Sequence, residues 1–92
     1  MDYPKVKYVE PLDDYQLFII FDNGEIKVYS MLEKLSTPAF SPLRNKSLFK
    51  SVYVDNGGYG IIWNDDIDLS EYELWKNAVT VATIETLIKT AA

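Results

Sequence analysis

The hydrophobic pattern of the first half of the chain predicts β-strands separated by short polar turns. Residues 5–10 alternate apolar and polar side chains, and Pro11 is expected to end this strand. Residues 15–21 form an almost unbroken apolar run, which is typical of a strand that lies inside a sheet or is covered on both faces. The second strand therefore needs burial on both of its sides.

A tight turn follows the apolar run. The pair Asn23-Gly24 suits the positive φ angles of a type I′ hairpin, so residues 25–29 should return antiparallel to the preceding strand. Alternation along this return strand places Lys27 and Tyr29 on the same face of the sheet. The three segments together predict a three-stranded meander.

Between residues 30 and 51 the pattern predicts a compact, irregular helical connection. Pro38 and Pro42 exclude one continuous helix, because proline lacks an amide hydrogen and clashes with the preceding turn. Short helical turns are expected near Leu35 and over residues 45–50. The apolar side chains of this segment, Phe49 among them, need burial, which favours packing over a flexible linker.

A second hairpin and a helix are predicted after this connection. Strands over residues 52–54 and 59–63 flank a glycine-rich turn that tolerates positive φ angles. Residues 64–66 are expected to break the second strand. Ser70 followed by Glu73 is a capping-box signature, so a helix should start near residue 71.

The C-terminal residues are expected to be helical, either as a second helix or as part of one bent helix, rather than as one straight helix. A stripe on one helical face consists of Ile84, Leu87, Ile88 and Ala91. Two alternatives remain for this stripe: it docks on a second copy or another protein, or it folds back on its own sheet.

In fold class, these segments predict one α+β domain. Its antiparallel sheet would contain about five short strands, arranged as the meander, the irregular helical connection and then the hairpin. The C-terminal helical segment would pack on that sheet. Residues 1–78 would form the domain, and residues 79–92 would be a helical extension of the same domain.

Composition removes several classes of function. The 92 residues include no Cys and no His, so disulfides, thiol nucleophiles, Ser-His mechanisms and His- or Cys-ligated metals are excluded within this chain. Fourteen acidic against nine basic residues give a formal net charge of −5, which disfavours nucleic acid and anionic membranes as partners. No stretch reaches the roughly 20 apolar residues of a membrane span and no secretory signal is visible, so we expect a cytoplasmic protein without a cofactor.

Several short motifs recur in a recognisable order over about residues 3–76. They are Pro4 and Val6, Val9-Glu10-Pro11, the apolar strand to Phe21, Asn23-Gly24-Glu25, Phe40 and Leu43, Leu48-Phe49, Val52 and Val54, Ile62-Trp63 and Ile67-Asp68-Leu69. This order resembles the small bacterial family of unknown function called DUF2442, from which the chain departs at Asp66, where a glycine is usual. The resemblance implies an α+β fold, no established activity and a role as an antitoxin-like partner.

One acidic cluster is a candidate metal site. Asp65, Asp66 and Asp68 lie within four positions, and hard cations such as Ca²⁺ or Mg²⁺ take oxygen ligands. The favoured alternative is that these residues shape a turn and satisfy backbone donors before the helix. No catalytic residue is assigned, and metal binding stays the weaker hypothesis.

An aromatic and aliphatic surface is the other candidate site. Tyrosine is enriched in interface hot spots, although strands also favour aromatic residues in buried positions. The candidate partner-binding residues are Tyr29, Tyr53, Tyr59, Ile84, Leu87 and Ile88.

The sequence therefore predicts a non-enzymatic protein-interaction module, which binds a protein partner, for example a basic one, or associates with itself. One alternative is a carboxylate-based protein that binds a metal or a small ligand. The other is a nucleic-acid-linked regulator, which the acidity of the chain disfavours.

Overall fold

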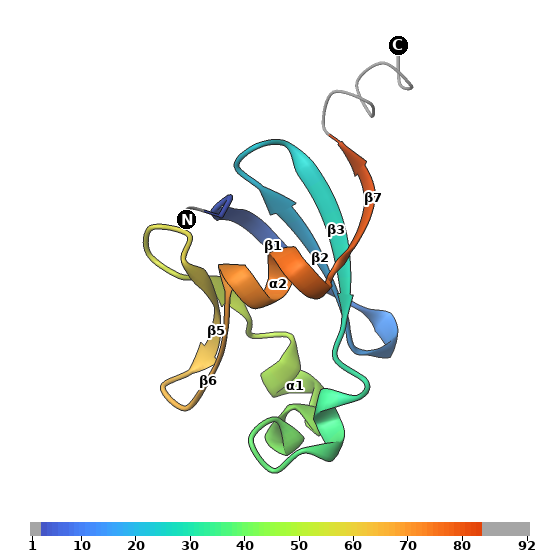
Figure 1. Cartoon of the computed structure of the whole chain (residues 1–92). Helices are drawn as coiled ribbons and strands as arrows, with labels where there is room; N and C mark the ends of the chain where they lie inside the picture. Colours follow the sequence, from blue (N-terminus) through green and yellow to red (C-terminus); the bar gives the residue numbers. More distant parts are fainter. Residues whose placement is uncertain (1–2, 84–92) are drawn as a thin grey trace.

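The computed structural model describes residues 3–83, which form two antiparallel sheets with a helix between them (Figure 1). Sheet A has the strand order β1-β2-β3-β7, and sheet B has the order β4-β5-β6. The strands are β1 (Val6–Leu12), β2 (Gln16–Phe21), β3 (Glu25–Ser30), β4 (Tyr53–Val54), β5 (Gly60–Asn64), β6 (Ile67–Ser70) and β7 (Val79–Thr83). The helices are α1 (Lys46–Phe49) and α2 (Glu71–Asn77), with 3-10 turns η1 (Asp13–Tyr15), η2 (Lys34–Ser36) and η3 (Ser41–Arg44).

The α+β class and the antiparallel pairing are confirmed, but the prediction of one sheet of about five strands is wrong. The described residues form two sheets with more strands than predicted, because β6 forms directly after the predicted strand break and β7 occupies residues predicted as helix. Residues 79–83 are Val-Thr-Val-Ala-Thr, and β-branched side chains fit a pleated strand better than a helix. The predicted stripe of Ile84, Leu87, Ile88 and Ala91 lies outside the described residues.

The N-terminal meander is confirmed, with two local differences. Strand β1 continues through Pro11, which pairs with Leu17. Proline is tolerated here because β1 is the edge strand of sheet A and has no neighbouring strand on its other side. The turn is not type I′, because only Gly24 has a positive φ, of 90°. The Gly24 amide donates to the Phe21 carbonyl (3.0 Å), which gives a three-residue loop that ends in a left-handed glycine.

The predicted irregular connection and helix start are also confirmed. The Asn45 Oδ1 atom caps α1 by accepting from two backbone amides, and Phe49 of α1 is buried. The Ser70 Oγ atom accepts from the Glu73 amide (3.1 Å), and α2 begins at the next residue, as the capping signature predicts.

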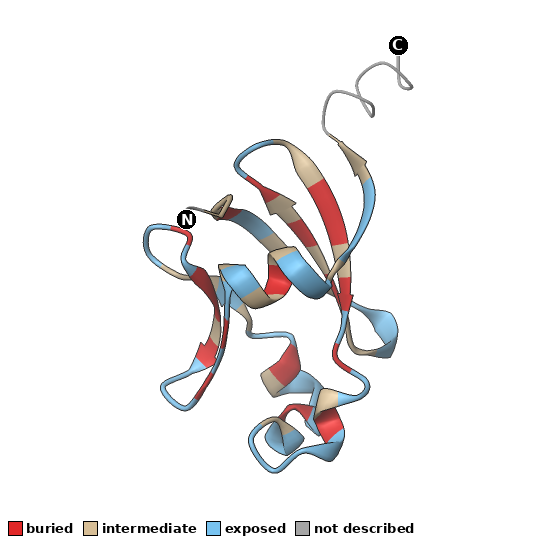
Figure 2. Ribbon diagram, viewed as in Figure 1, coloured by how far each residue is buried: buried red, intermediate tan, exposed pale blue. Residues whose placement is uncertain are grey.

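The core lies between the sheets and is closed by α2 and α1 (Figure 2). It contains Leu17, Ile19, Phe21, Leu43, Phe49, Ile61, Trp63 and Leu74. The sheets meet where the Val6 amide donates to the Gly58 carbonyl (2.8 Å). A Cβ atom at Gly58 would lie 2.6 Å from the Val6 carbonyl oxygen, so this junction requires glycine. Among the described residues, no helix has the length and hydrophobicity of a membrane span.

Candidate functional site

The register of sheet A gives it two faces with different surroundings. Leu17 pairs with Tyr29 and Ile19 pairs with Lys27, so these side chains share the core face. Ring contacts and hydrogen bonds join sheet A to α2 from this face. They link Phe21 to Trp75 (ring centroids 5.1 Å apart), Lys27 to Trp75 and Tyr29 to Glu73.

The opposite, outer face of sheet A is also apolar. It consists of cross-strand rows, since paired residues point to the same side of a sheet. One row runs from Phe18 through Val28 to Val79, and the other runs from Tyr8 through Ile20 and Ile26 to Ala82. We call these seven residues the outer face.

Several outer-face side chains contact solvent. Phe18, Ile20 and Val28 are half-buried, Tyr8 is 43% exposed and Val79 is 66% exposed, whereas Ile26 between Ile20 and Ala82 is buried at 1% exposure. The rings of Tyr8 and Phe18 pack edge to face with centroids 6.4 Å apart. In the part of the chain that the structure describes, no ring contact or side-chain hydrogen bond joins this face to α2 or to sheet B. The apolar run in β2 predicted cover on both sides, and the described chain supplies it on one.

A cleft of about 710 Å³ opens beside the outer face, because β3 continues beyond the start of β7. The last cross-strand pair is Val28 with Val79, and both residues line the cleft. The remaining lining comes from β2, β3, the segment around η2, and α2. It consists of Gln16, Tyr29, Ser30, Leu32, Glu33, Lys34, Glu73 and Asn77.

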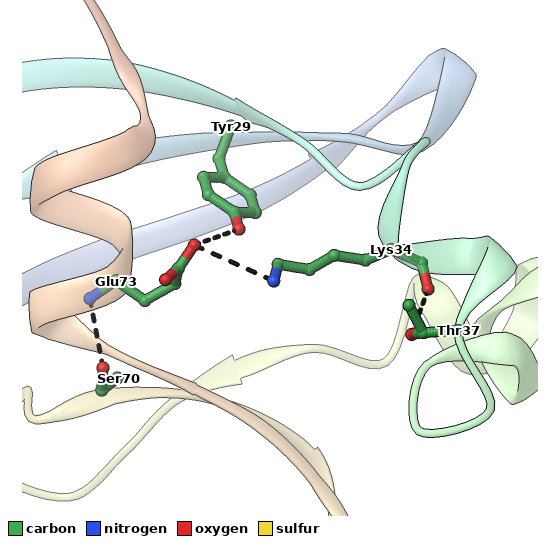
Figure 3. A network of polar contacts seen from close by, with 5 residues as sticks. All are labelled: Tyr29, Lys34, Thr37, Ser70 and Glu73. Carbon is green, nitrogen blue, oxygen red and sulfur yellow. Dashed lines mark hydrogen bonds and ion pairs between the residues drawn. The ribbon is translucent and has the colours of Figure 1, made fainter.

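Three side chains from separate elements meet in this cleft (Figure 3). The Tyr29 hydroxyl donates to the Glu73 Oε2 atom at 2.7 Å. The Lys34 Nζ atom lies 3.9 Å from the same oxygen, and both side chains of this ion pair are about one-third exposed, at 30% and 31%. Because both contacts fall on Oε2, the other carboxylate oxygen, Oε1, takes part in neither.

The Tyr29 hydroxyl acts as a donor in this network. Burial, and then the hydrogen bond to the Glu73 carboxylate, raises the pKa of Tyr29 well above its ordinary value of 10.0. The hydroxyl therefore keeps its proton at neutral pH and holds the carboxylate in place. This arrangement suits recognition of a charged or polar group.

The residues predicted as a partner-binding aromatic surface are not brought together. Tyr29 is buried on the core face at 5% exposure, whereas Tyr53 and Tyr59 are 54% and 57% exposed on the hairpin of sheet B. The Lys5 Nζ atom lies 4.6 Å from the centre of the Tyr59 ring. The predicted Ile84, Leu87 and Ile88 lie outside the described residues.

The three carboxylates of the predicted metal cluster are exposed and do not converge. Asp65 and Asp66 form the turn between β5 and β6, where the Asn64 Oδ1 atom accepts from the Asp66 amide at 2.8 Å. Asp68 points outward from β6. Within residues 3–83, no three Asp or Glu side chains form a group that could hold a metal ion.

The sequence pattern did not assign Glu73 and Lys34 to a site. Glu73 was predicted only as a helix-start residue, and Lys34 lies in the irregular segment near Leu35. Lys27 is a further case, since it is only 7% exposed on the core face. Its Nζ atom donates to the Trp75 carbonyl (2.7 Å) and lies 3.8 Å from the centre of the Trp75 ring. No local signal in the sequence distinguishes these residues from solvent-exposed ones.

Comparison with known proteins places the chain in a family but finds no curated or structural relative. No curated protein matches this chain, and no solved structure matches it either. The profile of one family, described as protein of unknown function (DUF2442), matches residues 6–80. This range includes sheet A up to the start of β7, all of sheet B and α2. The chain therefore belongs to the DUF2442 family.

Proposed function

We propose that this domain is a non-enzymatic protein-interaction module that binds another protein through the outer face of sheet A. One observation supports this proposal above the others: the outer face presents two apolar cross-strand rows in which Ile26 is buried, Phe18, Ile20 and Val28 are half-buried, and Tyr8 and Val79 are exposed. Contiguous exposed apolar patches on soluble domains mark interaction sites, because burying them releases about 25 cal/mol for each Å² of apolar surface.

The charge of the chain indicates the chemistry of the partner. The formal net charge is −5, so a partner with basic groups around an apolar centre would be attracted and oriented by the field of this domain. The outer face would supply the apolar contact area. Phe18 and Val28 lie in the same row and would form the centre of that contact.

The test compares two pairs of substitutions. Phe18→Gln with Ile20→Gln changes the outer face, and Tyr53→Gln with Tyr59→Gln is the matched control on sheet B. Each tagged protein is expressed in its native cells, the co-purifying protein is identified, and its affinity is then measured by calorimetry with purified components. We expect the outer-face variant to bind at least about ten-fold more weakly, and the control to bind within two-fold of wild type.

Three results would overturn the proposal. The first is a wild-type chain that retains no partner, and the second is an outer-face variant that binds as well as wild type while circular dichroism shows both folded. The third is evidence that the outer face is covered by this protein itself, either by a second copy or by the chain's own C-terminal residues. Sedimentation would reveal a second copy, and coupling between Phe18→Gln and Leu87→Gln in a double-mutant cycle of stability would reveal the chain's own C-terminal residues.

A further inference from the structure

We propose that the cleft beside the outer face receives a basic side chain, arginine or lysine, of the partner protein. This inference rests on the proposed function, because it assigns the cleft to the protein that covers the outer face. The binding chemistry of the cleft is testable without that partner.

The shape of the cleft suits a long side chain with a charged end. Leu32 and Val79 line it and are 52% and 66% exposed, and Val28 adds a third apolar wall. The aliphatic stem of an arginine or lysine packs on such walls while its charged end reaches polar groups. A volume of about 710 Å³ is ample for one such side chain.

The charges in the cleft favour a cation. Among the described residues, two carboxylates, Glu33 and Glu73, line it against one ammonium group, that of Lys34. Lys34 approaches the Glu73 Oε2 atom only to 3.9 Å, whereas a close charge-assisted hydrogen bond would lie near 2.8 Å. The Glu73 Oε1 atom takes no part in the contacts with Tyr29 and Lys34, so a guanidinium group could bind there. An anion would instead meet two like charges.

The carboxylate is held in place before a ligand arrives. The Tyr29 hydroxyl donates to Glu73 Oε2 from the core face, and the Ser70 Oγ atom caps the first turn of α2 at the Glu73 amide. A group fixed in this way loses little conformational freedom on binding. The cleft is also continuous with the outer face, since Val28 and Val79 belong to both.

The experiment is an NMR titration of the full chain with N-acetyl-arginine methylamide. The matched probe is N-acetyl-citrulline methylamide, which has nearly the same shape and no charge. We expect the arginine probe to shift the amide signals of residues 29–34, 73 and 79, and the citrulline probe to shift them far less. Glu73→Gln should weaken binding of the arginine probe about five-fold. Glu10→Gln is the control, because the Glu10 carboxylate accepts a hydrogen bond from the Tyr8 hydroxyl away from the cleft, and it should leave binding unchanged.

Equal binding of both probes would overturn this inference, and so would an arginine probe that shifts only the amide signals of residues on other surfaces. So would a Glu73→Gln protein that is folded and binds arginine as wild type does. The Phe18→Gln/Ile20→Gln protein separates the two proposals, because its cleft is intact and should still bind the arginine probe. If that variant binds the probe and the partner normally, the proposed function fails alone; if wild type binds its partner but not the probe, this inference fails alone.

Discussion

The two faces of sheet A are built from similar side chains and have different surroundings. On β2, Leu17, Ile19 and Phe21 are fully buried against the core, while Phe18 and Ile20, which alternate with them, are half-buried on the outer face. Hydrophobicity alone therefore marks both faces as surfaces that need cover. The fold shows that only one of them receives cover from α2 and sheet B. We expect the core face to determine stability and the outer face to determine binding.

The largest effect should separate two neighbouring isoleucines. Ile19→Ala removes three carbons from the packed core and should lower the free energy of unfolding by about 2–5 kcal/mol, since a cavity remains. Ile20→Ala makes the same chemical change on the outer face and should cost about 1 kcal/mol, because its side chain is only partly buried. Urea unfolding of both variants, followed by circular dichroism, measures the two values.

Equal costs at the two positions would contradict the distinction between the faces. They would mean that the outer face is as fully packed as the core in solution. If Ile19→Ala does not fold at all, Ile19→Val provides the milder comparison, with an expected cost of about 0.5–1.5 kcal/mol.

The features of the fold that depend on neighbouring residues were predictable. The position of the Asn23-Gly24 turn, the breaks at Pro38 and Pro42 and the Ser70 cap all depend on a few neighbouring residues, whereas the type of that turn and the passage of β1 through Pro11 did not follow from them. The extent of β7 was not predictable in this way. Residues 79–83 are stabilised as a strand by pairing with β3, about fifty residues earlier in the chain, and a helical stripe farther along had suggested helix.

The candidate site was less predictable than the fold. Tyr29 was named as a partner-binding residue, but its hydroxyl points inward to a carboxylate 44 residues away. Lys27 lies on the core face because a carbonyl and an aromatic ring of α2 satisfy its ammonium group. Such pairings arise only when the sheet and helix assemble. Alternation along β3 did place Lys27 and Tyr29 together, and the fold shows that both lie on the core face, toward α2.

The Tyr29–Glu73 bond connects the core face to the cleft, and its loss should have an intermediate effect. Tyr29→Phe keeps the buried ring and removes the hydroxyl, so it should cost roughly 1.5–3 kcal/mol at neutral pH, as expected for a hydrogen bond to a charged acceptor. Urea unfolding checks this value. Tyr53→Phe on the exposed hairpin is the control and should change stability little.

This bond also gives the wild-type chain a pH dependence of known sign. The pKa of the Tyr29 hydroxyl is raised in the folded state. As the pH rises past the ordinary pKa of 10.0, the unfolded chain therefore loses the hydroxyl proton before the folded chain does. The stabilisation is complete below about pH 10 and decreases as the pH rises further. The stability gap between wild type and Tyr29→Phe should therefore be narrower at about pH 11 than at about pH 8. A gap that is constant or wider would show that the hydroxyl is not held by Glu73.

The smallest effect should come from Lys34, which contacts the same carboxylate from the solvent side. Its ion pair with Glu73 is long and about one-third exposed, so Lys34→Gln should change stability by less than about 0.5 kcal/mol. The substitution also removes a positive charge that lines the cleft, so the arginine probe should bind about two-fold more tightly in the NMR titration. Lys46→Gln on α1 is the control and should change neither measurement. If Lys34→Gln destabilised the chain as much as Tyr29→Phe, the ion pair would be part of the fold and the Glu73 carboxylate would not be available to a partner.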